Sequence, residues 1–495
     1  ARTVEDEDKI WMSRTAAYNN FSTSTPVKDD DAVIFSIAGR RSNKIQHAVN
    51  IGKLIILTDD GEWLVGGGAA GAVTPTDINL QQQGYSGSSD LMPVMVGNTA
   101  LYVQSKGSVV RNLIYQFQSD SYAGADLTVF ATHLFRNHII VDWAYQQTPD
   151  SIIWAVRDDG VLLGLTYLPE HDIWGWHRHE TDGEYESVAI VDEGNKDSVY
   201  FVVKRINLLG VAERFIEKLE ERKEDVIDSF YVHSGLTFDS REMQRGVLNV
   251  RNANGYQVDL NLVVDSGGND YVFTQDSVGD ELRFTVGGKE VRVTIQSVTN
   301  ATNAIGESSI ELDTGLNGLT FNSNQYLVAL DTFSGLSHLN GKVVSVLADG
   351  FVEFDGNDTD DPRVDNYTVS GGEISLSRPA TVVHIGLPYQ SDFQTLPLEI
   401  ANSETIANRR KIVNKIGLSV QASRGYFAGE TFDNLKEYKQ RRVDDGYGAQ
   451  RTETDFLEMS INATFNRPGH VCVRQSVPLP ISILAVTATG LVGGN

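Results

Sequence analysis

The segment IIWAVRDDGVLLGLTY, residues 152–167, contains two runs of β-branched, aromatic and aliphatic residues that meet at Asp159–Gly160. Such runs favour extended strands, and glycine takes the positive φ of a tight turn without steric cost. The order of strand, glycine turn and strand therefore predicts a β-hairpin.

Three further segments repeat this arrangement. Strand-like runs also meet at Gly61, Gly107 and Gly210, and together with Gly160 these turn glycines are 46, 53 and 50 residues apart. A period near 50 residues holds two hairpins, which is the spacing of four-stranded β-propeller blades. A β-sandwich, the alternative, gives similar hairpins without a reason for so even a period. The predicted fold class is all-β, with a β-propeller-like platform.

The repeat is interrupted between about residues 230 and 333. Runs of alternating apolar and polar residues replace it, for example Gln257–Val264 and Glu290–Gln296. Alternation gives a strand one wet and one buried face, as in a small barrel or sandwich. The propeller-like pattern resumes at Lys342–Phe354, around Asp349–Gly350. An inserted β domain explains the interruption.

We therefore predict a chain of four parts: propeller-like blades (1–229), an inserted small β-barrel or sandwich (230–333), a resumed blade (334–400) and a C-terminal β region (401–495). The charged stretch Lys436–Asp445 in the last part is predicted to be a solvated loop. The stretch Glu217–Asp228 has a helix-like charge pattern, but we favour a charged linker into the insertion.

The composition limits the possible functions. The chain has 66 Asp and Glu against 41 Lys and Arg, a net charge of −25, which argues against tight nucleic-acid binding. An acidic surface would still let a DNA duplex slide past, although charge that simply keeps a protein dispersed is the alternative. No run approaches the ~20 apolar residues of a membrane-spanning helix. The one cysteine, Cys472, excludes an internal disulfide framework and is predicted to be a buried, inert thiol.

Three motifs resemble ligand sites. Gly66–Gly71 matches GxGxxG, with Asp90 at a suitable distance, but Pro75 and the lack of a following helix argue against a dinucleotide site. His177 and His179 lie at i, i+2 on one predicted strand face, a pair that can hold a metal only with a third ligand. Asp355–Asp361 is oxygen-rich, but it lacks the glycine and distal glutamate of an EF-hand loop. Exposed or stacked strand histidines and a solvated hairpin tip are the preferred interpretations.

No arrangement of catalytic residues stands out. Pairs of carboxylates occur throughout the chain, so no spacing identifies a glycosidase pair. The sequence around Ser86 lacks the final glycine of the GxSxG motif. We therefore predict no catalytic, metal or cofactor-binding residues, no cofactor and no enzymatic activity.

Several longer strings resemble one family. The chain is similar to podovirus tail nozzle proteins, the tail tubular protein B-like family, through Trp11–Thr15 (WMSRT), Gly124–Thr128 (GADLT), Ala144–Asp150 (AYQQTPD), Ile153–Tyr167, Trp176–Gly183 (WHRHETDG), Leu339–Gly350 and Ile385–Tyr389 (IGLPY). These strings span most of the chain outside the insertion.

The resemblance implies a structural virion protein of a short-tailed phage, assembled in the host cytoplasm. Its copies would form a hexameric ring below the tail adaptor, which serves as the distal DNA conduit and as a platform for tail fibres or spikes. Two alternatives stay open. One is a receptor-binding tail component whose insertion (230–333) binds a glycan, and the other is a propeller glycoside hydrolase, which no acid/base pair supports.

Overall fold

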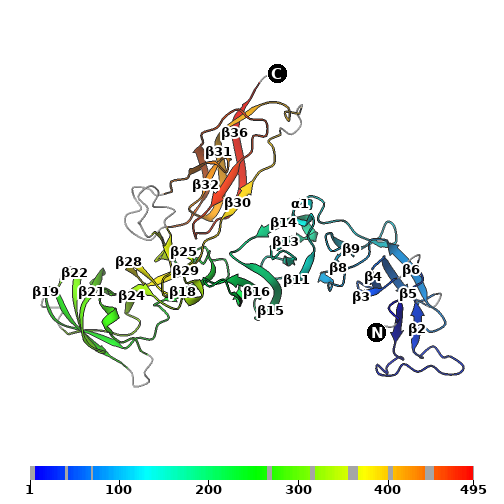
Figure 1. Ribbon diagram of the computed structural model, residues 1–495, viewed down its shortest axis with the longest axis horizontal. Coiled ribbons are helices and arrows are strands. Elements are labelled where there is room, and N and C mark those ends of the chain that lie inside the picture. Colours follow the sequence, from blue (N-terminus) through cyan, green and yellow to red (C-terminus); the bar gives the residue numbers. More distant parts are fainter. Residues whose placement is uncertain are drawn as a thin grey trace. The chain divides into compact units, whose positions relative to one another are not determined.

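Strands make up almost all of the regular structure in this computed structural model (Figure 1). The structure describes residues 6–39, 43–68, 71–264, 270–312, 318–354, 366–399, 405–440 and 451–493. The chain divides into two units: unit 1 runs to Ile206 and includes Ala212–Leu219, and unit 2 comprises Asn207–Val211 and the residues from Glu220 onward. The predicted all-β class is confirmed.

Unit 1 is a series of small antiparallel sheets, each formed by strands consecutive in the chain. The sheets are β1 (Lys9–Met12) and β2 (Val33–Ser36); β3 (Ile45–Asn50), β4 (Leu54–Thr58), β5 (Glu62–Gly66) and β6 (Asn79–Gly84); β7 (Val94–Val96), β8 (Thr99–Val103), β9 (Val110–Gln116) and β10 (Ser121–Ala123); β11 (Ile140–Gln146), β12 (Ile152–Arg157), β13 (Leu162–Leu168) and β14 (Ile173–His179); and β15 (Glu184–Asp192), β16 (Asp197–Ile206) and β17 (Ala212–Lys218). The described part contains one α-helix, α1 (Thr132–Phe135), and short 3₁₀ turns at Pro169–His171, Gln275–Ser277 and Ser337–Leu339. With four residues, α1 is far too short to cross a bilayer.

Successive sheets of unit 1 are joined face to face by hydrophobic clusters. On β12, Ile153 and Ala155 pack with the sheet β7–β10, whereas Ile152, Trp154 and Val156 pack with β15 and β16. The strands β4 and β8 divide their side chains between two clusters in the same way. Because both faces of these inner strands are buried, their sequences are continuous apolar runs rather than alternating ones. The arrangement is that of stacked, blade-like sheets.

The turn glycines of the repeat occupy equivalent places. Gly61, Gly107, Gly160 and Gly210 all lie between the second and third strand of their sheets. The backbone φ is positive at Gly107, Gly160 and Gly210, as predicted, but not at Gly61. The prediction is wrong at Gly61, where lack of space requires glycine: an added Cβ would lie 2.6 Å from the carbonyl oxygen of Gly84.

In unit 2, a central sheet combines strands from both sides of the sequence interruption. Its order is β18 (His233–Asp239), β29 (Val382–Leu387), β25 (Val343–Ala348) and β26 (Phe351–Glu353), and β27 (Tyr367–Thr368) also pairs with β25. The turn between β25 and β26 is Asp349–Gly350, both with positive φ. The chain therefore leaves this sheet after β18 and returns to it at β25.

Between these strands lies a seven-stranded antiparallel sheet. Its order is β23 (Leu319–Phe321), β19 (Val247–Val263), β22 (Asn303–Leu312), β21 (Lys289–Asn300), β20 (Glu281–Val286), β24 (Tyr326–Phe333) and β28 (Ile374–Ala380). The sheet curls around its own core, since the rings of Phe284 in β20 and Phe321 in β23 lie 4.4 Å apart although three strands separate them. No ladder of described residues joins its edges, so the sheet is open and not a closed barrel.

The C-terminal part of unit 2 is a two-sheet sandwich around one core. The first sheet is β30 (Ser391–Gln394), β35 (Cys472–Gln475), β32 (Phe427–Thr431) and β33 (Asn434–Glu437); the second is β34 (Glu453–Ser460), β31 (Lys411–Ser423) and β36 (Ile483–Val492).

Two local predictions can be compared with the structure. Glu217 and Lys218 belong to β17, and the described residues from Leu219 to Asp228 form no helix, which agrees with the linker interpretation for that part of Glu217–Asp228. The stretch Lys436–Asp445 is only partly a loop, since Lys436 and Glu437 belong to β33; its residues from 441 on lie outside the described part.

The face-to-face stacking can be tested at Ile153, which is 0% exposed between two sheets. We expect Ile153→Ala to lower the free energy of unfolding of unit 1 by about 2–5 kcal/mol, because it removes buried methyl groups and leaves a cavity. Denaturant unfolding measures this change. The matched control Ile216→Ala, at a residue 79% exposed, should change it by no more than about 0.5 kcal/mol. Equal effects of the two substitutions would contradict burial between the sheets.

Candidate functional site: a polar network at the root of the seven-stranded sheet

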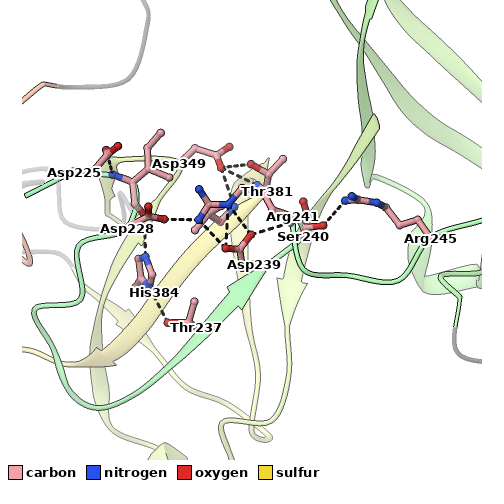
Figure 2. A network of polar contacts seen from close by, with 12 residues as sticks. Asp225, Asp228, Thr237, Asp239, Ser240, Arg241, Arg245, Asp349, Thr381 and His384 are labelled. Carbon is pink, nitrogen blue, oxygen red and sulfur yellow. Dashed lines mark hydrogen bonds and ion pairs between the residues drawn. The ribbon is translucent and has the colours of Figure 1, made fainter. Parts of the chain in front are cut away.

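Charged and polar side chains meet where the chain leaves the central sheet of unit 2 (Figure 2). They come from the segment before β18, from the end of β18, from the turn after β25 and from β29. These segments are far apart in the sequence. The network therefore holds several segments that are distant in the sequence together at one point.

Arg241 is at the centre of the network. Its guanidinium nitrogens donate to both carboxylate oxygens of Asp239, at 2.7 to 3.0 Å, and to Asp228. Burial tends to raise the pKa of Asp239, but the hydrogen bonds and charge of Arg241 outweigh it and lower that pKa. The hydrogen bonds to the two carboxylates raise the pKa of Arg241 itself. Asp239 and Arg241 are therefore charged at neutral pH, and Arg241 ties the end of β18 to the linker.

Asp349 forms a second anchor. Its Oδ1 accepts hydrogen bonds from the Thr381 backbone N–H (2.9 Å), the Thr381 hydroxyl (2.6 Å) and the Val382 N–H (2.9 Å). Its Oδ2 accepts one from Nη1 of Arg283, at 2.7 Å. Arg283 lies in β20 and also contacts the Pro379 carbonyl and Glu281. This ion pair links the seven-stranded sheet to the central sheet. The Arg283 side chain is 13% exposed and that of Asp349 is 24% exposed, so the pair is largely shielded from bulk water.

Arg245, just before β19, connects the start of that strand to the start of β24 in the curled sheet. Its Nε donates to the carbonyl of Ser323 at 2.9 Å, and its Nη1 donates to the carbonyl of Ser240. The guanidinium also lies over the ring of Tyr326, 5.6 Å from the centroid, and the Tyr326 hydroxyl donates to the Gly246 carbonyl. Burial lowers the pKa of Arg245. These contacts hold the start of β19 against the start of β24.

His384 fastens the linker to the central sheet. Its Nε2 donates to the carbonyl of Ile227 at 2.9 Å, and its Nδ1 lies 2.8 Å from the hydroxyl of Thr237. A carbonyl can only accept, so Nε2 carries the proton and Nδ1 can accept from the threonine in the neutral ring. Burial, the largest effect, lowers the pKa of His384, although Asp228 and Asp239 oppose it. The neutral ring thus holds the linker by a hydrogen bond rather than by charge.

The network is composed of ion pairs and hydrogen bonds to backbone carbonyls and amides. Directional contacts of this kind fix the angle at which two sheets meet, which packing of apolar side chains does less strictly. The arrangement is suited to a structural joint.

The sequence had indicated other residues, and the structure places them elsewhere. Gly66 ends β5, and the described residues 71–78 that follow the loop form no helix; residues 69 and 70 lie outside the described part. Added Cβ atoms would collide with the Ala72 backbone at Gly67 and with the Asp77 carboxylate at Gly68. The glycines therefore serve a tight loop. Asp90 lines a polar cavity of about 360 Å³ together with Lys44, Gln46, Asp59, Ser88, Ser89 and Ser105.

His177 and His179 do lie on one face of β14. His177 Nδ1 and His179 Nε2 are 2.7 Å apart, and both rings pack edge-on against Trp154. The two histidines are thus stacked against a tryptophan, one of the two arrangements expected from the sequence. Among the described residues, the three-residue group with metal-ligand spacing is a different one, His138 with Asp158 and Asp159. Its Asp159 is already paired with Arg157, whose hydrogen bonds lower the pKa of that carboxyl.

Cys472 is 2% exposed in β35, and burial raises the pKa of its thiol, as expected for an inert cysteine. Ser86 lies two residues after the end of β6, outside any helix or strand. The oxygen-rich loop Asp355–Asp361 lies outside the described residues.

Sequence reasoning missed the polar network. The turn Asp349–Gly350 was recognised, but not the role of the aspartate side chain. A histidine at position 384 within the apolar run Val382–Leu387 was an available signal, because a histidine in a fully buried strand requires hydrogen-bond partners. Its partners could not be identified from spacing, since Ile227 is 157 residues away.

Comparisons with known proteins give one informative match. Residues 6–140 match the family model described as bacteriophage nozzle protein, which confirms the resemblance over that part of the chain and supports a structural protein of the phage tail. No curated protein matches the sequence. A solved structure of a protein from Lactobacillus plantarum matches with a TM-score of 0.18 and 8% identity, covering 53% of this chain and 94% of that one, values too low to support an argument.

The link between the two sheets can be tested at Arg283. We expect Arg283→Met to destabilise the seven-stranded sheet by about 1.5–3 kcal/mol, since it leaves Asp349 and Glu281 without their charged donor. Hydrogen exchange should then accelerate in β20 and β24. The control Arg292→Met removes an exposed ion pair with Glu290 in the same sheet and should cost no more than about 1 kcal/mol. Equal exchange in the two variants would contradict the anchoring role.

The depressed pKa of His384 predicts a pH dependence. The folded pKa lies below the ordinary value of 6.5, so the stabilisation is complete above that value and decreases as the pH falls through it toward the folded pKa. We expect the unfolding temperature of the wild type to fall more steeply from about pH 8 to about pH 5 than that of His384→Gln. Parallel pH profiles of the two proteins would contradict this assignment.

Proposed function

We propose that this chain, which matches the bacteriophage nozzle family over residues 6–140, is a tail nozzle subunit of a short-tailed phage. Its copies associate in a ring, most simply a hexamer, that forms the distal conduit for DNA and a platform for tail fibres or spikes. The ring docks on the tail adaptor in the virion after assembly in the host cytoplasm. The observation that carries this proposal is the family match.

The charge and the fold support a conduit. A net charge of −25 disfavours tight binding of a polyanion, so acidic residues that face a channel would let DNA pass without being held. Rigid sheets buried on both faces suit a wall that bears mechanical load. We propose that the protein works by assembly, without enzymatic activity.

The proposed parts of the subunit follow the sheets. Residues 1–229 contain the stacked blade-like sheets and the linker, and 230–333 contain most of the curled sheet. Residues 334–400 return to the central sheet, and 401–495 form most of the sandwich. We propose that the blade-like sheets form a propeller-like platform.

One alternative has an observation in its favour. Side-chain amides and hydroxyls form a hydrogen-bonded row across the curled sheet, from Thr320 to Asn249 (2.8 Å), to Asn261 (3.3 Å) and to Asn303 (3.0 Å). Such groups also bind sugar hydroxyls, which would suit a receptor-binding tail component. All four side chains are, however, partners of one another.

The mass of the purified protein in solution tests the conduit. We expect native mass spectrometry to show a closed oligomer, six times the 54.4 kDa chain for a hexamer, with a central channel in electron micrographs. Heterologous contacts around a rotation axis close such a ring. A protein that remains monomeric at high concentration and binds host polysaccharide would contradict the conduit and favour the receptor-binding alternative.

A further inference from the structure

The strand β36 is an unprotected edge of the C-terminal sandwich. It is ten residues long and pairs on one side with β31, and no strand of the described residues pairs with its other side. Residues 475–495 contain no charged side chain, in a chain where 22% of residues are charged. An open edge exposes a row of backbone N–H and C=O groups that can pair with another strand.

The other edges of this protein are protected. Among the described sheets, every other edge strand either contains a charged residue or is no longer than six residues. For example, β17 carries Glu213, Arg214, Glu217 and Lys218. Short strands and charges are the usual devices against unwanted edge pairing. Because β36 has neither, its open edge is suited to being covered by another strand.

The exposed side chains of β36 allow close approach. Ala485, Thr487 and Thr489 are small and exposed, whereas Val486 and Ala488 pack into the sandwich core. Leu484 and Leu491 are 64% and 65% exposed although they are large and apolar. Neither face of the strand carries a charge that would select a basic or acidic partner. The strand β36 therefore places no charge against a partner strand.

The opposite edge of the same sheet is β34. It is eight residues long, and on the described residues it pairs only with β31. It carries Glu453, Asp455 and Glu458, so two copies of β34 side by side would place like charges together. An uncharged strand beside β34 meets no such repulsion.

We propose that β36 of one subunit pairs with β34 of the next, so that the three-stranded sheet continues from copy to copy around the ring. Both strands are antiparallel to β31, so they run parallel to one another. A rotation about an axis that lies along the strands keeps this direction in the next copy. Each subunit then offers one donor edge and one different acceptor edge, the heterologous contact that a ring requires. This inference deepens the proposed function and rests on it for the ring.

Two adjacent proline substitutions test the pairing. Neighbouring residues of a strand direct their N–H groups to opposite edges, so one of Thr487→Pro and Ala488→Pro removes a bond to β31 and the other removes a donor at the open edge. We expect one variant to melt at a lower temperature. The other should melt like the wild type but lose the oligomer completely by light scattering.

Matched controls retain the backbone N–H. Thr487→Val and Ala488→Val should assemble like the wild type. If the wild type and both proline variants form the same oligomer, the role of β36 is overturned while the ring stands. If the wild type is monomeric, the ring and the pairing fail together.

Disulfide trapping distinguishes the two ways in which copies could pair. Thr487→Cys is combined in turn with Phe456→Cys, Glu458→Cys and Ser460→Cys on β34; the native Cys472 is buried. Within one subunit β31 separates the two strands, which is too far for a disulfide. We expect at least one pair to give a ladder of linked multimers upon oxidation. Dimers formed by Thr487→Cys alone would indicate β36 pairing with itself and would overturn the assignment to β34.

Discussion

The structure of unit 1 depends on the burial of both faces of its inner strands. Side chains such as Ile153 and Trp154 are adjacent in sequence and point into different clusters, so neither face of the sheet can be left in water. Removing that apolar surface from water is the dominant favourable contribution to folding. A single small sheet cannot provide it alone, and each sheet therefore requires its neighbours. The stacked order of the sheets follows directly from this requirement.

The curled sheet of unit 2 meets the same requirement differently. Its strands alternate, as in β20, where Leu282 and Phe284 are buried and their neighbours are not. One face is wet, so the sheet buries the other by bending around a single core. It needs no second sheet for its interior. It is attached to the central sheet by apolar packing of β24 and β28 against β25 and β29, and also by polar contacts such as the pair Arg283–Asp349.

The edge strands of the sheets are a further feature of this architecture. A protein built from many small open sheets has many edge strands, each of which could pair with a neighbouring molecule. Most edges here are short or charged. The strand β36 lacks this protection, and the acidic β34 lies at the other side of the same sheet. Residues 6–140 match the bacteriophage nozzle protein family. An edge strand that can pair with another subunit suits the assembly proposed for this chain.

The sequence alone determined the strands and most of the turns. Apolar runs, alternation and turn glycines are local properties, and backbone sterics act on each of them within a few residues. It therefore predicted the all-β class, the repeat at Gly107, Gly160 and Gly210, and the linker after β17. At Gly61 the sequence predicted a positive φ, which the structure does not show. The glycine is required there because the carbonyl of Gly84 on a neighbouring strand leaves no room for a Cβ.

Only the tertiary structure decided which residues form the polar network of unit 2 and which edge of β36 has no partner among the described strands. Contacts such as His384 with Ile227 connect residues 157 positions apart, and no local pattern encodes which distant carbonyl a buried histidine will meet. Likewise, an uncharged run at residues 483–492 predicts a strand but not whether one or both of its edges are paired. Local sequence sets the conformation of a segment; the path of the whole chain sets its neighbours.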